Sequence, residues 1–172
     1  MSKKNTTFKI CITALFLGLN IVFSSFSLPV PGGHLYLNDV VICLASLLLE
    51  PWYAFCVGGI GAFLGDFFFY PTPMFVSLVV HGLQAIIISV FAHYIMKKHT
   101  VASSLIGLIL GAMIMIVGYS LGRAFVYATV ETAILKLPFQ VLQAMTGVVV
   151  APILSFKCGV KNAYETILNK RK

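Results

Sequence analysis

The stretch FSLPVPGGHLYLND, residues 26–39, interrupts a very apolar chain close to its beginning. Its two prolines and two adjacent glycines exclude a continuous helix, because proline lacks a backbone donor and glycine loses much entropy when ordered. The stretch is also longer than a tight turn. It therefore ends a first apolar helix, and Asn38 or Asp39 is the expected N-cap of the next one.

The composition around this stretch indicates a membrane protein. The chain has 172 residues, of which 59% are hydrophobic and 10% charged, and its mean hydropathy is +0.98. Soluble domains carry about 25% charged residues, so this chain cannot cover a soluble surface. The net charge of +7 does not indicate nucleic-acid binding, because most positive charges flank apolar stretches. The four cysteines form no CxxC pair and are interpreted as small hydrophobic residues.

The apolar pattern predicts an all-α integral membrane protein with six transmembrane helices in one domain over residues 1–172. Glu50-Pro51 separates the second span from the third, since proline ends one helix and can begin the next. A cleaved signal peptide is not expected, because the first apolar run is too long and the rest of the chain is equally apolar. The predicted spans are 9–26, 39–50, 52–69, 74–96, 101–125 and 137–156.

The distribution of lysine and arginine predicts that both termini are cytoplasmic. Ten of the twelve basic residues then lie on the inner side, while Lys136 lies outside and Arg123 within a span. The outer connections are 27–38, 70–73 and 126–136, and the inner ones are Glu50-Pro51 and Lys97–Thr100. The ten inner residues are Lys3, Lys4, Lys9, Lys97, Lys98, Lys157, Lys161, Lys170, Arg171 and Lys172.

Polar side chains inside the predicted spans gather toward the outer side. Such residues are costly in a bilayer and are therefore functional candidates. Arg123 lies near the outer end of the fifth span, and Tyr119 and Tyr127 lie four residues to either side on the same face. We predict a polar cavity that is open outward and closed inward by apolar side chains. The polar residues are Asp66, His81, Gln84, Arg123, Gln140 and Gln143; only Gln84 lies near the midplane.

Each of these residues also has a purely structural interpretation. Arg123 can snorkel to the outer interface or pair with Asp66 or Glu131. Asp66 can bridge helices, and His81 can be a hydrogen-bonded residue between helices. The tyrosines can form an aromatic belt. Their shared depth, rather than any single residue, favours the cavity.

Motifs for an intrinsic energy source or for catalysis are absent from the sequence. There is no GxxxxGK[ST], HExxH or GxSxG motif and no Cys/His metal set, so we expect neither enzyme activity nor a metal or cofactor. A stand-alone secondary transporter with Asp66 or Glu131 as coupling group is an alternative. An intramembrane enzyme and a scaffold are further alternatives, which the missing motifs and the polar cavity disfavour.

Three segments carry a resemblance to a known family: PGGHLYLND (31–39), GGIGAFLGDFFFYPTPMF (58–75) and VVHGLQA (79–85). They resemble the substrate-binding S component of energy-coupling factor (ECF) vitamin transporters, and the similarity extends over about residues 9–155. Among these it is most similar to members that take up hydroxymethylpyrimidine or pyridoxine. Many relatives have Gly-Pro where this chain has Glu50-Pro51, which leaves the shape of that inner turn open.

The resemblance implies a compact S-component bundle in the bacterial plasma membrane. The subunit would bind a vitamin and work with a transmembrane coupling subunit and two cytoplasmic ATPase subunits. Cys11, Ala14 and Gly18 on the first helix would contact the coupling subunit, since small residues allow close helix contact. The connections 27–38 and 70–73 would close over the vitamin, and the subunit would topple in the membrane to carry it inward.

A pyrimidine or pyridine vitamin offers a flat ring with nitrogen and hydroxyl groups, which tyrosines can stack on and polar side chains can bind. Pantothenate is the alternative vitamin, because its carboxylate would give Arg123 a bidentate partner. The predicted binding residues are His34, Tyr36, Asn38, Asp66, Tyr70, His81, Gln84, Tyr119, Arg123, Tyr127 and Gln143.

Overall fold

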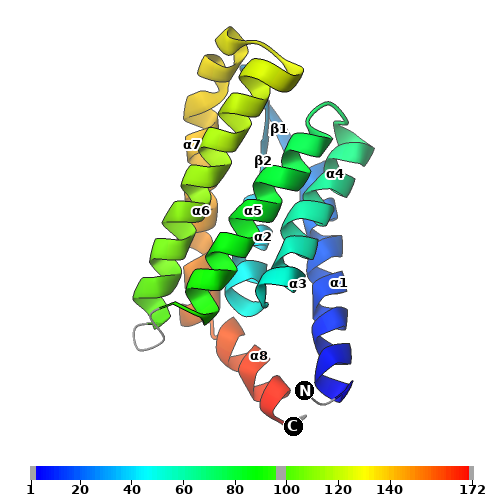
Figure 1. The fold of residues 1–172 in the computed structure, drawn as a ribbon, viewed down its shortest axis with the longest axis vertical. Coiled ribbons are helices and arrows are strands. Elements are labelled where there is room, and N and C mark those ends of the chain that lie inside the picture. Colours follow the sequence, from blue (N-terminus) through cyan, green and yellow to red (C-terminus); the bar gives the residue numbers. More distant parts are fainter. Residues whose placement is uncertain (1–2, 96–99, 171–172) are drawn as a thin grey trace.

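The computed structural model describes residues 3–95 and 100–170 and is almost entirely helical. A bundle of long helices carries a β-hairpin at one end and a short amphipathic helix, α8, at the other (Figure 1). The elements are α1 Lys3–Ser25, β1 Ser27–Val30, β2 Gly33–Tyr36, α2 Asn38–Leu48, α3 Pro51–Phe55, α4 Gly61–Phe69, α5 Met74–His93, α6 Thr100–Gly122, α7 Val130–Pro152 and α8 Val160–Asn169, with π-helical turns at Cys56–Ile60, Arg123–Tyr127 and Ile153–Lys157.

Five helical segments in the described part of the chain are long and apolar enough to cross a membrane. The predicted span 39–50 is the exception, because it forms the 11-residue helix α2. At 1.5 Å per residue α2 is only about 16 Å long, roughly half of a bilayer core. Nine of its residues are buried, and it packs against α1, α5 and α7. The five segments are Asn5–Ser25, Pro51–Phe69, Met74–His93, Thr100–Tyr127 and Val130–Lys157.

The chain between α1 and α2 folds into an antiparallel hairpin rather than an irregular connection. β1 pairs with β2 in the register Ser27↔Tyr36 and Val30↔Gly33. The turn depends on Gly32 and Gly33, whose φ angles of 79° and 146° are rarely adopted by other residues. The expected N-cap was wrong, because Leu37 occupies that position and Asn38 lies inside the first turn.

Helix α7 begins at Val130, seven residues before the predicted start of the sixth span. Thr129 caps it, and a reciprocal capping box joins Thr129 to Thr132. Pro138 lies inside the helix, where the sequence had suggested a helix start. The predicted outer connection 126–136 is therefore much shorter, and Lys136 is a helical residue with 2% of its surface exposed.

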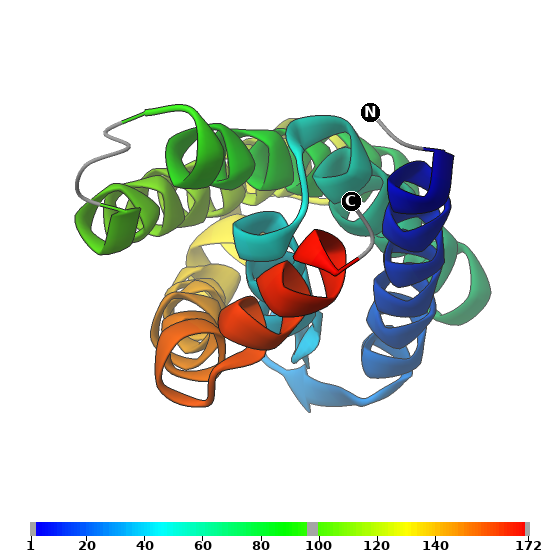
Figure 2. The same ribbon diagram turned by 90° about the horizontal axis from the view of Figure 1, so that it is seen from below.

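The end of the bundle opposite the hairpin is closed by α8, which was not predicted and lies across the bundle (Figure 2). Tyr164 stacks on Phe8 with ring centroids 5.8 Å apart. It also packs against a buried apolar cluster of Ala45, Leu48, Leu49 and Val57. Lys9 forms an ion pair of 2.5 Å with Glu50 at this end. The start of α1 and helix α8 thus lie at the same end of the molecule (Figure 1).

Part of the predicted inner side falls outside the described residues. This applies to Lys97, Lys98 and most of the inner turn, to residue 96 at the end of the fourth span, and to Arg171 and Lys172.

The two sides of α1 differ in their packing. Asn20 and Ser24 face the bundle, where Gly61 and Gly65 of α4 leave room for them. Cys11 and Ala14 are exposed, and a Cβ at Gly18 would meet no atom within 4 Å. The small residues singled out on the first helix therefore lie on a face that the bundle does not cover.

Candidate functional site

A cavity lies beneath the hairpin, between β2 and the parts of α4, α6 and α7 that lie near the hairpin. It holds about 380 Å³ of empty space, a figure that includes its opening to solvent. Its lining is His34, Tyr36, Asp66, Tyr70, Pro73, Met115, Tyr119, Arg123, Lys136, Gln140 and Gln143.

Helix α7 contributes three polar side chains to the wall. Lys136, Gln140 and Gln143 are spaced i, i+4 and i+7, which places them on one helical face. All three are buried. Gln140 donates to the carbonyl oxygens of Ile116 (2.7 Å) and Met115 (3.3 Å), and so ties α7 to α6.

Three side chains hold the hairpin over the cavity. Arg123 donates from Nη1 to the carbonyl of Gly32, and Lys136 donates to the carbonyl of His34. The backbone N–H of Tyr36 donates to Oε1 of Gln143 at 3.1 Å. The glycine turn fits closely here, because a Cβ on Gly33 would lie 2.9 Å from Arg123 Nη1. The hairpin is thus fastened through its backbone by side chains from the far end of the chain.

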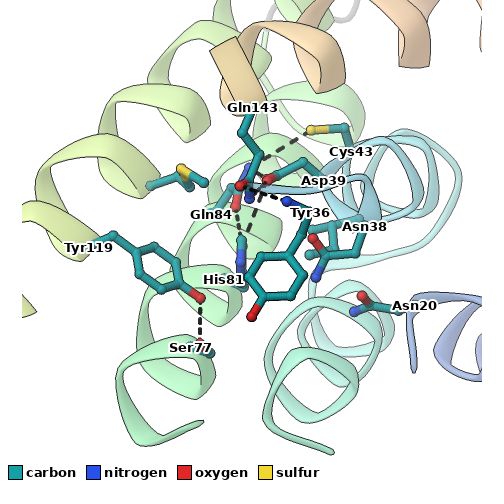
Figure 3. A network of polar contacts seen from close by, with 12 residues as sticks. Asn20, Tyr36, Asn38, Asp39, Cys43, Ser77, His81, Gln84, Tyr119 and Gln143 are labelled. Carbon is teal, nitrogen blue, oxygen red and sulfur yellow. Dashed lines mark hydrogen bonds and ion pairs between the residues drawn. The ribbon is translucent and has the colours of Figure 1, made fainter. Parts of the chain in front are cut away.

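Below the cavity, Asp39 is the centre of a buried polar network (Figure 3). Its carboxylate accepts hydrogen bonds from Nε2 of Gln143 at 2.6 Å and from Nε2 of Gln84 at 3.1 Å. Nδ1 of His81 lies 3.9 Å from the same carboxylate and 2.7 Å from Oε1 of Gln84. A fully buried carboxylate requires such partners. Gln143 joins this network to the hairpin, because it contacts both Asp39 and Tyr36.

The opposite wall contains Asp66, which accepts a hydrogen bond from the Ser77 hydroxyl. Ser77 also contacts the Tyr119 hydroxyl (Figure 3). Together with Asp66, these residues form one small network that joins α4, α5 and α6. Arg123 pairs with neither Asp66 nor Glu131, the two partners considered from the sequence. Among the described residues, the ion pairs are Lys9–Glu50 and His81–Asp39.

Several buried polar atoms around the cavity have no hydrogen-bond partner among the described residues. They are His34 Nδ1, Tyr36 Oη, Arg123 Nε and Tyr127 Oη. Burial raises the pKa of the Tyr36 phenol above its usual value, so this hydroxyl stays a donor. Unpaired buried groups are costly unless something binds to them. Four of the ten such atoms in the described part of the chain therefore lie around this cavity.

The structure brings seven of the eleven predicted binding residues to the cavity wall. The other four lie close by: His81 and Gln84 belong to the network below, and Asn38 donates to Ser24 at 3.3 Å. Tyr127 packs on Arg123, whose guanidinium carbon lies 5.4 Å from the ring centroid. The seven lining residues are His34, Tyr36, Asp66, Tyr70, Tyr119, Arg123 and Gln143.

Sequence reasoning missed Lys136 as a site residue and Asp39 as more than a helix cap. The spacing of Lys136 with Gln140 and Gln143 was a usable signal, but Lys136 had been placed in a connection. Within residues 3–95 and 100–170, no group of three or more His, Cys, Asp or Glu residues is placed to hold a metal ion.

Membrane-length helices around a small polar cavity define the class: a helical membrane protein with a small-molecule site. The chain belongs to the ECF-type riboflavin transporter, S component family, whose model matches residues 4–159. A solved structure of the S component of a bacterial ECF transporter has the same fold, with a TM-score of 0.70. That match covers 90% of this chain and 96% of the solved one, at 19% sequence identity.

A protein of Pyrococcus woesei, described as "Uncharacterized protein in gap 3'region", is 28% identical over 131 residues. The match covers 75% of this chain and 86% of the relative. Membership of the family makes the chain a substrate-binding transport subunit rather than an enzyme, and its apolar helices fit a multi-pass membrane protein. S components of ECF transporters work with a coupling subunit and ATPases.

Proposed function

We propose that the cavity beneath the hairpin captures a small B-group vitamin or vitamin precursor, with hydroxymethylpyrimidine and pyridoxine as the first candidates. The observation that carries this proposal is the cluster of unpaired polar atoms on His34, Tyr36 and Arg123 inside a small, aromatic-lined cavity. A ring with nitrogen and hydroxyl groups would complete these hydrogen bonds.

The lining suggests how such a ring is held. Tyr36, Tyr70 and Tyr119 offer aromatic faces or edges against a flat ligand. The ring centroids of His34 and Tyr70 lie 5.0 Å apart, and this contact joins β2 to the end of α4. The hairpin would open to admit the vitamin and close again through Arg123, Lys136 and Gln143. His81 and Gln84 would act indirectly, by fixing Asp39 and through it Gln143.

Riboflavin and pantothenate are the competing ligands. The matched family is named for riboflavin, whose three fused rings with a ribityl chain are larger than a pyrimidine or pyridine ring. Pantothenate is favoured by the presence of Arg123 in the lining, since a guanidinium binds carboxylates in bidentate fashion.

Transport would require partners. The uncovered face of α1 with Cys11, Ala14 and Gly18 is suited to close contact with the transmembrane coupling subunit. Two cytoplasmic ATPase subunits would supply the energy, and the subunit would topple to deliver the vitamin inward. In this proposal the hairpin faces outward and both termini are cytoplasmic, in agreement with the distribution of basic residues.

Isothermal titration of the purified protein with hydroxymethylpyrimidine, pyridoxine, riboflavin and pantothenate tests the proposal. We expect tight binding of one of them, and weaker binding after Tyr119→Ala. Failure of all four to bind would refute the proposal. Uptake by the chain alone in ATP-depleted vesicles would instead support a secondary transporter that uses Asp66 or Glu131.

A further inference from the structure

Two basic side chains form one side of the cavity. Arg123 comes from the π-helical turn after α6, and Lys136 comes from the second turn of α7. Both line the cavity, with exposed fractions of 8% and 2%. They therefore place two buried positive charges in the wall of the cavity.

Neither charge has a carboxylate partner among the described residues. Each donates to a backbone carbonyl of the hairpin, at Gly32 and His34. The two acidic residues nearby are engaged elsewhere. Asp39 accepts from Gln84 and Gln143 and faces His81, while Asp66 accepts from Ser77.

The two basic groups also have unused donors. A guanidinium has five N–H donors and an ammonium has three. The structure gives each group one hydrogen-bond acceptor, and Nε of Arg123 is buried without one. Burying a charge is costly unless a counter-charge or several hydrogen bonds compensate it. The missing counter-charge can be supplied by whatever occupies the cavity.

We propose that the physiological ligand carries an anionic group, a carboxylate or a phosphate, which Arg123 and Lys136 bind beneath the hairpin. This inference rests on the proposed function and narrows its ligand. A guanidinium holds such a group in bidentate fashion, while the ammonium acts as a point charge beside it. A pyrimidine or pyridine vitamin would then be captured as its acid or phosphate form. Because the same two side chains fasten the hairpin, the anion would also couple binding to closure.

Matched ligand pairs that differ in one acidic group provide the test. Suitable pairs are pantothenol and pantothenate, pyridoxine and pyridoxic acid, and riboflavin and riboflavin phosphate. Their dissociation constants would be measured by isothermal titration on the purified full chain at fixed ionic strength. For the pair that binds, we expect the anionic member to bind about tenfold to hundredfold more tightly, as one or two charge-assisted hydrogen bonds allow.

Substitutions then assign this preference to the two residues. Arg123→Gln and Lys136→Gln should each reduce the ratio of the neutral to the anionic dissociation constant toward one. The ratio is informative even if a variant weakens the closure of the hairpin, because both ligands share that loss. Lys157→Gln removes an exposed positive charge at the other end of the bundle and should leave the ratio unchanged.

The outcomes separate this inference from the proposed function. Tight binding of a neutral ligand with no preference for its anionic partner would overturn the inference and keep the vitamin-binding function. No binding in any pair would refute the function, and the inference with it. Phosphatidylglycerol added in excess should not compete. Competition by that lipid would assign Arg123 and Lys136 to a membrane headgroup and would also overturn the inference.

Discussion

The hairpin end and the α8 end of the bundle are closed in opposite ways. At the hairpin end, a glycine turn is fastened by Arg123, Lys136 and Gln143 over a cavity with unpaired polar atoms. At the other end, α8 packs through Tyr164 onto a buried apolar cluster. There the buried cation Lys9 has an acidic partner, Glu50.

This difference indicates that the two ends of the bundle differ in how easily they open. A closure made of a few hydrogen bonds to a short hairpin opens at low free-energy cost. At the other end, the apolar contacts of Val160 and Tyr164 with the buried cluster hold α8 in place. The hairpin end is therefore suited to admit and release a ligand. The α8 end is suited to keep the bundle sealed. Substitutions at the hairpin end should therefore change ligand binding, and substitutions at the α8 end should change stability.

Gly32→Ala should have the largest effect on ligand dissociation. The substituted residue would have to keep the left-handed backbone conformation of Gly32, at a cost of about 1 kcal/mol. Its Cβ would also lie 2.8 Å from the carbonyl oxygen of Thr132. The hairpin must then shift away from α7. We expect dissociation to become about tenfold to hundredfold faster, since each 1.4 kcal/mol is a factor of about ten. Stopped-flow or filter-binding chase experiments would measure it.

Gly159→Ala is the matched control at the α8 end. Gly159 is also left-handed, with a φ of 75°, but a Cβ there would meet no atom within 4 Å. It carries the same backbone cost without the clash, and its dissociation rate should equal that of the wild type. If ligand dissociation became faster by the same factor in both variants, the hairpin would only connect α1 to α2 and would not close the cavity.

Gln143→Leu should weaken equilibrium binding by a smaller amount. It removes the bond to the Tyr36 backbone N–H and one donor to Asp39, so both the closure and the network below are weakened. We expect about a tenfold rise in the dissociation constant, the size of one hydrogen bond to a charged group. Thr146→Val, three residues further along α7, is the control because the hydroxyl of Thr146 donates to the Gln143 carbonyl of its own helix. Binding by Gln143→Leu at wild-type strength would contradict the proposed coupling.

Tyr164→Ala should affect stability and leave ligand affinity unchanged. It removes the stack on Phe8 and the cover over the apolar cluster. We expect a loss of about 1–2 kcal/mol, typical for removing a partly buried aromatic side chain, seen as a lower melting temperature. Asn162→Ala, on the exposed side of α8, should melt like the wild type. A large loss of affinity in Tyr164→Ala would show that the two ends are not independent.

The helices were predictable because hydrophobic spans of membrane length give a strong signal in the sequence. The five long segments follow from it, and Pro51 at the start of α3 marks the break between α2 and α3. The second predicted span, 39–50, became a short buried helix, because neighbouring helices shield α2 from lipid. Helix α8 escaped detection because it is polar on average, although Val160, Tyr164 and Leu168 lie on one face.

The presence of a polar cavity could be predicted from the sequence, but the contacts between its residues could not. Polar residues at one depth pointed to it, but contacts between distant segments fix what each residue does. The sixth span was predicted to begin at residue 137, although α7 begins at Val130, and this placed Lys136 in a connection. Asp39 follows Asn38 and looked like a cap, while only the fold brings Gln84 and Gln143 to its carboxylate. The prolines and glycines likewise masked the strand pattern of the hairpin.

The central claim is that the hairpin end holds a vitamin beneath a closed hairpin. Native mass spectrometry of the protein purified from cells in a mild detergent tests it most directly. The account predicts one retained small molecule of vitamin size on the wild type and on Gly159→Ala, and its loss from Gly32→Ala. A ligand-free wild type, or equal retention by Gly32→Ala, would contradict the account.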